Sequence, residues 1–97
     1  MMYRRRRGNR GRRPSPLYVS HNSATKEFIP HPEGAQEPVS LEPAELEVLR
    51  LIDLLNLSQE EAGEKMGTSR GTIWRLLQSA RLKVTSALIE GRKIVLV

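Results

Sequence analysis

The sequence predicts a mainly α-helical domain, in which three helices contain a helix-turn-helix and a small β-ribbon joins the N-terminal segment to a C-terminal strand. Three observations predict this fold class. Apolar side chains recur at helical spacing through residues 43–89. Short β-prone runs flank that region on both sides. Residues 1–16 combine Arg, Gly and Pro with almost nothing to bury, so we expect a disordered basic arm there.

Residues 17–38 are expected to form an extended or β segment followed by a loop. The runs LYV (17–19) and EFI (27–29) are β-prone, and HNS (21–23), Pro30 and Pro32 interrupt them. We predict a weak strand at 27–29 and leave 17–19 open. Residues 32–38 are predicted to be a loop.

A first helix is predicted over about 43–55, within a helical domain that spans 39–91. Pro43 suits the first turn of a helix, and Glu42, Glu45 and Glu47 favour the positive end of its dipole. The helix is apolar nearly all round, which is typical of packing on more than one side. Asn56 fits its end.

A second helix, about 59–66, begins with the capping box Ser58-Gln59-Glu60-Glu61 and ends at Gly67, which suits a left-handed position. A third helix, about 69–89, has an apolar stripe and ends at Gly91. Leu82 lies opposite the stripe. The stripe consists of Ile73, Leu76, Leu77, Ala80, Val84, Ala87 and Leu88. The apolar run KIVLV (93–97) predicts a terminal strand, which needs a partner.

The spacing of residues 59–78 predicts a helix-turn-helix. Gly63 is small where the two helices approach, Gly67 suits the turn, and Ile73 and Leu76 face inward. An ordinary three-helix bundle with a glycine at one corner is the alternative.

In a helix-turn-helix, the start of the third helix lies in the major groove of double-stranded DNA. Arg75 and Gln78 carry donors suited to guanine and adenine edges. Thr68 would meet a phosphate, as would Ser69. Trp74 is left open between a DNA contact and packing against residues 17–38. The predicted recognition residues are Ser69, Arg70, Gly71, Thr72, Trp74, Arg75 and Gln78.

The charge distribution supports a polyanionic partner. Residues 1–13 hold seven Arg and no acid, residues 14–68 are acidic, and residues 69–97 are basic again. We expect the arm to contact phosphates or the minor groove. Its basic residues are Arg4, Arg5, Arg6, Arg7, Arg10, Arg12 and Arg13.

Several classes of function are not expected. The absence of Cys excludes disulfides and cysteine metal sites, and no apolar run is long enough to span a membrane. His21 and His31 have no partner at motif spacing, and Glu60, Glu61 and Glu64 form a solvated acidic face. We therefore expect no enzyme, no cofactor and no metal, in a cytoplasmic, nucleoid-associated protein.

Residues 41–91 resemble region 4 of sigma factors, and more closely the UPF0251 or DUF134 family of predicted DNA-binding proteins. The resemblance is carried by EPVSLEPAELEVLRLIDLLNLSQEEAGEKMGTSRGT (37–72), SAR (79–81) and ALIEGRKI (87–94), and RRP (12–14) and FIP (28–30) also match. It implies a sigma-region-4-like fold and a DNA-binding role for residues 69–78. Many members carry N-terminal cysteines, which this chain lacks.

The expected function is prokaryotic transcription regulation through DNA binding. Two alternatives remain open: a sigma-like module that docks on the transcription machinery, and RNA binding through the Arg-rich arm. A homodimer is favoured over a monomer, because the strand at 93–97 would otherwise expose an apolar edge.

Overall fold

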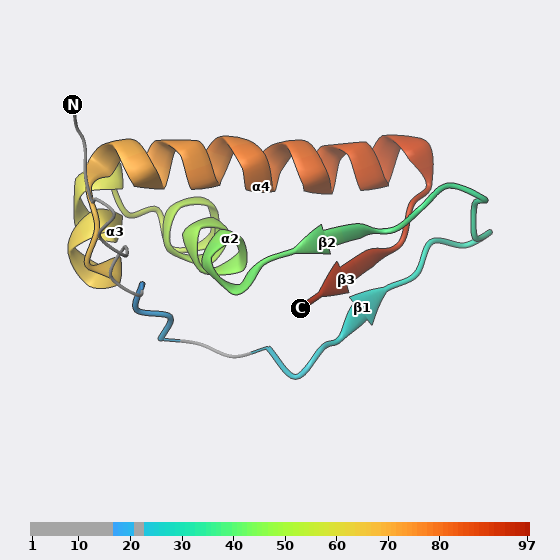
Figure 1. The fold of residues 1–97 in the computed structure, drawn as a ribbon, viewed down its shortest axis with the longest axis horizontal. Helices are drawn as coiled ribbons and strands as arrows, with labels where there is room; N and C mark the ends of the chain where they lie inside the picture. The colour runs from blue at the N-terminus through green and yellow to red at the C-terminus, as the bar shows by residue number, and fades with distance from the viewer. Residues whose placement is uncertain (1–16, 21–22) are drawn as a thin grey trace, which may run out of the picture.

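The computed structural model describes residues 17–20 and 23–97, so the predicted arm lies outside the described residues. The fold is mainly helical with a small sheet, as predicted. In Figure 1 the long helix α4 runs the length of the molecule, with α2 and α3 against its N-terminal half and the sheet below its C-terminal half. The elements are β1 (Glu27–Phe28), β2 (Val39–Leu41), α2 (Pro43–Val48), η1 (Leu49–Leu54), α3 (Gln59–Met66), α4 (Arg70–Glu90) and β3 (Ile94–Leu96).

The predicted first helix consists of two parts. Pro43 begins α2, and the Glu45 carboxylate accepts a hydrogen bond from the Glu42 backbone N–H at 2.9 Å. From Leu49 the chain continues as a π-helix, in which the Leu55 N–H donates to the Arg50 carbonyl. The wider π turn shifts the phase of the side chains. Leu54 and Leu55 are therefore exposed. The prediction that the helix packs on more than one side is wrong for these last residues.

The predicted caps of α3 and α4 are confirmed. The Ser58 hydroxyl accepts from the Glu61 N–H, and the Glu61 carboxylate accepts from the Ser58 N–H at 2.8 Å. Gly67 ends α3 and Gly91 ends α4, both in the left-handed conformation. These local signals decide where both helices begin and end.

The sheet has the order β1-β3-β2, so the C-terminal strand β3 lies in its centre. It runs antiparallel to β1 and parallel to β2 (Figure 1). The predicted pairing of residues 27–29 with 93–97 is confirmed, whereas β2 was not predicted. Residues 17–19 form no strand, although the Tyr18 N–H donates to the Met66 carbonyl at 3.1 Å. With a partner on each side, β3 does not expose the edge on which the sequence prediction of a dimer relied.

One apolar cluster holds the helices together. It consists of Val48, Leu51, Ala62, Met66, Ile73 and Leu77. The α4 stripe is mostly confirmed, but Leu88 is 73% exposed. The prediction was wrong there because Leu88 lies at the margin of the stripe, and only the small sheet lies below the last turns of α4.

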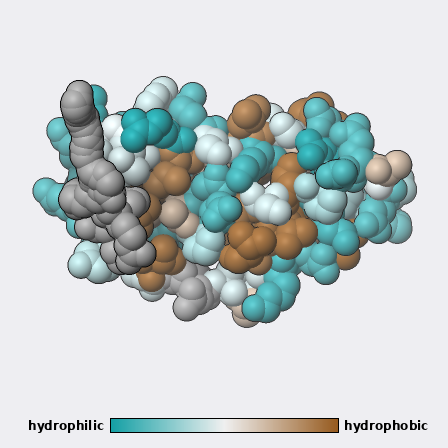
Figure 2. All heavy atoms as spheres, viewed as in Figure 1, coloured by the Kyte–Doolittle hydropathy of each residue, from teal (hydrophilic) through white to brown (hydrophobic). Residues whose placement is uncertain are grey.

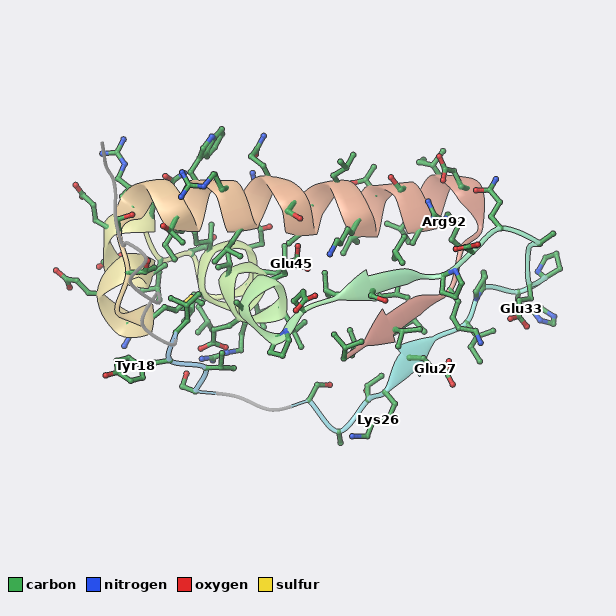
Figure 3. The ribbon with its side chains drawn as sticks, viewed as in Figure 1. Tyr18, Lys26, Glu27, Glu33, Glu45 and Arg92 are labelled. Carbon is green, nitrogen blue, oxygen red and sulfur yellow. The ribbon has the colours of Figure 1, made fainter. Side chains whose placement is uncertain are left out.

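Two carboxylates are buried beside this core. Glu45 accepts from Lys83 Nζ at 2.8 Å and from the Ser79 hydroxyl, and so ties α2 to α4 (Figure 3). Burial raises the pKa of Glu45, but these hydrogen bonds outweigh it and lower the pKa overall. Glu47 accepts hydrogen bonds from Arg50 and from the backbone N–H and the hydroxyl of Ser20, and so holds the N-terminal segment against α2.

In the described part of the chain, no helix is long and apolar enough to cross a bilayer.

Candidate nucleic-acid interface

The first turns of α4 present one continuous exposed face. Gly71, Trp74, Arg75 and Gln78 are all exposed, while Ile73 and Leu77 on the opposite side are fully buried. The core fixes the rotation of the helix, because those two side chains pack against α2 and α3. The structure therefore brings most of the predicted recognition residues together on one surface. Thr72 lies at its margin and is half-buried.

A tight turn holds α3 against the start of α4. A Cβ atom on Gly63 would lie 2.8 Å from the Thr68 carbonyl oxygen, so the helices can approach this closely only at a glycine. The Thr68 N–H donates to the Gly63 carbonyl at 2.9 Å, and Gly67 adopts a φ of 71°. The predicted roles of Gly63 and Gly67 are confirmed.

Hydroxyl groups at the start of α4 bond to one another. Ser69 Oγ accepts from the Thr72 N–H at 3.2 Å and lies 3.1 Å from Thr72 Oγ1. Arg75 Nη2 donates to Thr72 Oγ1 at 3.4 Å, which holds the guanidinium along the exposed face. The Ser69 hydroxyl thus caps the helix, and it is the backbone N–H groups of the first turn that face outward without helical partners.

A shallow hollow of about 470 Å³ lies between the starts of α3 and α4. Gln59, Arg70, Gly71 and Trp74 line it. Trp74 is 47% exposed there. None of the described residues in 17–20 and 23–38 lines this hollow, so the packing alternative for Trp74 gains no support. Gln59 was not among the predicted site residues, and its only signal was its place as the first residue of α3.

Salt bridges modify the charge of this surface. Arg70 Nη1 lies 3.8 Å from Glu60 Oε2, and both side chains are largely exposed. Arg81 forms two hydrogen bonds to Asp53, which lower the pKa of that carboxyl group. Among residues 17–20 and 23–97, Arg75 has no carboxylate within salt-bridge distance. The free positive charge of the face therefore centres on Arg75.

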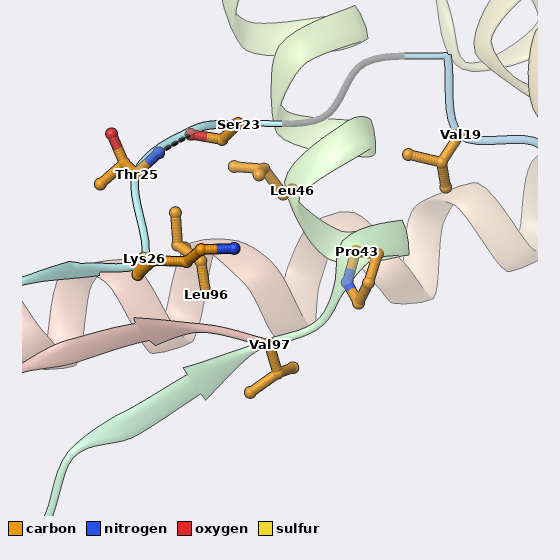
Figure 4. Close-up of a pocket in the computed structure, with 8 residues that line it drawn as sticks. All are labelled: Val19, Ser23, Thr25, Lys26, Pro43, Leu46, Leu96 and Val97. Carbon is orange, nitrogen blue, oxygen red and sulfur yellow. Dashed lines mark hydrogen bonds between the residues drawn. The ribbon is translucent and has the colours of Figure 1, made fainter.

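A second hollow, of about 370 Å³, lies beside the sheet (Figure 4). Its walls come from Val19, Leu46, Leu96 and Val97, and among the described residues that line it, Lys26 carries the one ionisable side chain. The Ser23 hydroxyl accepts a hydrogen bond from the Thr25 N–H at 3.1 Å and so stabilises the loop. In the described residues, no three His, Asp or Glu side chains gather as a metal ion requires.

The predicted arm, Arg4 to Arg13, lies outside the described residues.

Residues 2–97 match the family model described as "Protein of unknown function DUF134". A UPF0251 protein of Archaeoglobus fulgidus is 42% identical over 96 residues, 98% of this chain and 91% of the relative. One from Pyrococcus furiosus is 42% identical over 93 residues, 93% of this chain and 86% of its own length. A third, from Methanococcus maripaludis, is 44% identical over 89 residues, 88% of this chain and 67% of its own length. No solved structure gives a significant match.

Proposed function

Because this chain belongs to the DUF134 family of proteins of unknown function, its role must follow from its own surface, and we propose that it binds duplex DNA through α3 and α4. The pair forms a helix-turn-helix of the sigma-region-4 type. The observation that carries the proposal is the exposed face of Gly71, Trp74, Arg75 and Gln78 beside a tight α3–α4 turn. A helix presented in this way fits the width of the major groove.

Arg75 and Gln78 are the base-reading residues of the proposal. They lie one helical turn apart on the exposed face, so both reach the floor of the groove together. An Arg side chain bonds guanine O6 and N7, and a Gln side chain bonds adenine N6 and N7. Trp74 offers an apolar surface to a thymine methyl or a sugar.

Phosphate contacts come from the start of α4 and from Gln59, the first residue of α3. The N-terminal N–H groups of α4, at Arg70 and Gly71, attract anions, and Gln59 and Arg70 border the hollow beside them. The exposed Arg70–Glu60 pair is worth about 0–1 kcal/mol, so Arg70 can exchange Glu60 for a phosphate. Glu60, Glu61 and Glu64 make the rest of α3 acidic, which disfavours any approach that lays α3 along the DNA backbone.

Sequence-specific binding of this kind would make the protein a transcriptional regulator located on the nucleoid. Selection from a random duplex library would identify its site. Arg75→Ala should then weaken binding to the selected duplex by about 5- to 150-fold, equivalent to about 1–3 kcal/mol, with a much smaller loss on a scrambled duplex.

Arg81→Ala is the matched control, because Arg81 is an exposed α4 arginine that already pairs with Asp53 at 2.6 Å. It should leave the preference for the selected duplex unchanged. Equal losses on both duplexes for Arg75→Ala would make Arg75 a phosphate contact. Failure of the intact chain to bind any duplex at low salt would reject the proposal and favour docking on a protein.

A further inference from the structure

Among residues 17–20 and 23–97, β1 pairs with β3 alone, so its outer edge is open for pairing. On its inner side, the Lys26 carbonyl accepts from the Leu96 N–H at 2.8 Å. The direction of the backbone groups alternates along a strand, so the N–H and C=O groups of Glu27 point away from β3. The N–H and C=O groups of Ile29, two residues on, point to the same outer side. Figure 3 shows Lys26 and Glu27 along this outer rim of the sheet.

The other edge of the sheet is closed. The Val39 N–H donates to the Lys93 carbonyl, and the Leu41 carbonyl accepts from the Val97 N–H, so both groups point toward the β3 side and the Ser40 carbonyl points outward. Lys83 Nζ donates to that carbonyl at 2.8 Å, and the ammonium group also pairs with Glu45. A charged side chain that covers an outward carbonyl protects a strand edge from further pairing. The open edge at β1 thus differs from the edge at β2.

An apolar groove of about 250 Å³ runs beside the open edge. Phe28, Ile29 and Pro30 form one wall, and Ala87 and Leu88 of α4 form the other. Phe28 is 58% exposed, Ile29 56% and Leu88 73%. Ile89 on the next position of α4 is also exposed, and Figure 2 shows hydrophobic atoms at the surface along this half of the helix.

We propose that this surface, the β1 edge together with its groove, binds a second copy of the chain. The two β1 strands pair antiparallel about a two-fold axis, and Leu88 of each copy enters the groove of the other. Such an isologous contact uses the open β1 edge of both copies, so it gives a closed dimer to which no third copy can add. The proposal does not depend on DNA binding, since Arg75 lies in the second turn of α4 whereas Ala87 and Leu88 of the groove lie in its last turn.

Charge selects the register of the two strands. An axis at Glu27 would set two carboxylates directly opposite each other, which destabilises a strand pair. An axis at Phe28 instead places the two aromatic rings opposite each other and sets Glu27 against Ile29 of the partner copy. Glu27 pairs with Lys93 of its own copy at 3.4 Å, and this register brings no second carboxylate beside that ion pair.

The apolar area is enough for a weak dimer. Four large exposed side chains each offer roughly 100 Å² to a partner, so the two copies together bury about 800 Å², and the paired strands add to this area. The four are Phe28, Ile29, Leu88 and Ile89. Specific interfaces begin at about 1,000 Å². We therefore expect a dissociation constant in the micromolar range rather than an obligate dimer.

Sedimentation of the full chain without DNA, from low to high micromolar concentration, tests this proposal. The natural sequence should dimerise, and Leu88→Glu should raise the dissociation constant by at least tenfold. Leu54→Glu is the matched control, because Leu54 is 71% exposed but lies on η1, outside the groove. Circular dichroism would establish that both variants keep their helices. A chain that stays monomeric at high micromolar concentration, or equal effects of the two variants, would overturn the proposal.

A cross-linking experiment tests the register separately. The chain has no Cys, so Phe28→Cys introduces a single thiol. With the axis at Phe28, the two Cα atoms lie about 4.5–5.5 Å apart, within reach of a disulfide. Mild oxidation should convert this variant to a covalent dimer much faster than Leu54→Cys. Equal rates for the two variants would contradict the proposed pairing.

Discussion

At the scale of single residues, the buried carboxylates of α2 do more than favour the start of a helix. Glu47 is 2% exposed and bonds to Arg50 and to the backbone and hydroxyl of Ser20. The hydrogen bond from Arg50, with those from Ser20, lowers the pKa of Glu47 to about 2 despite its burial. The ionised form is therefore the one that the folded state stabilises.

Glu47→Gln should destabilise the protein by roughly 3 kcal/mol at pH 7, because a carboxyl pKa that falls from 4.5 to about 2 on folding corresponds to a stabilisation of the ionised form of that size. The pKa is lower in the folded state than in the unfolded state. The contribution is therefore complete above the unfolded pKa near 4.5 and is lost as the pH falls toward 2. Urea unfolding at pH 7 and pH 3 should show the gap between the two proteins narrowing.

The exposed Glu64 provides the control for this measurement. Glu64→Gln should change the free energy of unfolding by less than about 0.5 kcal/mol at either pH. A gap between Glu47→Gln and the natural sequence that stays constant with pH would mean that packing, rather than charge, accounts for the loss.

At the scale of elements, α4 serves a packed face and an exposed face at once. A Cβ atom on Gly71 would meet only Ser69 Oγ at 3.9 Å, so nothing in the described residues requires a glycine at this helical position. Glycine inside a helix costs about 0.5–1 kcal/mol relative to alanine. Close approach of a DNA backbone would explain why the position lacks a side chain.

Gly71→Ala should therefore raise the melting temperature slightly while weakening duplex binding by about tenfold, in line with a loss near 1.4 kcal/mol. Thermal unfolding and duplex titration would measure the two effects. Gly63→Ala makes the contrast, since its Cβ would meet the Thr68 carbonyl at 2.8 Å and should lower stability. Unchanged DNA affinity in Gly71→Ala would show that DNA does not approach this turn.

The elements with local signals are those that the sequence predicted well. The capping box at Ser58 and the glycines at 67 and 91 act within a few residues, so α3 and α4 have the expected bounds. Strand β2 has only three residues and pairs with a strand far along the chain, so no local pattern distinguishes it. The hydrogen bonds between Glu47 and Ser20 were missed for the same reason, because the two residues lie 27 positions apart. The candidate interface was largely predictable, because helical periodicity already separates Arg75 and Gln78 from the core face.

At the scale of the whole molecule, positive charge is densest at the N-terminal end of the sequence. Residues 1–13 contain seven arginines and no acid. Each of them that neutralises a phosphate contributes about 0.9 to the slope of log affinity against log salt. Deletion of residues 1–13 should therefore weaken duplex binding and flatten its salt dependence, with an unchanged circular dichroism spectrum. An identical slope in the shortened chain would show that the arm does not contact DNA.

The central position of β3 has a consequence for the order of folding. Contacts between α3 and α4 join residues close in sequence, whereas Glu27 pairs with Val95 and Val39 with Ile94, at separations of 68 and 55 residues. Closing such long loops costs entropy before any contact compensates it, so low-contact-order helices form first. Strands β1 and β2 each pair with β3 and not with each other, so the sheet cannot form until β3 lies between them. Substitutions in β3 should therefore act on the unfolding rate, and those in the helical cluster on the folding rate.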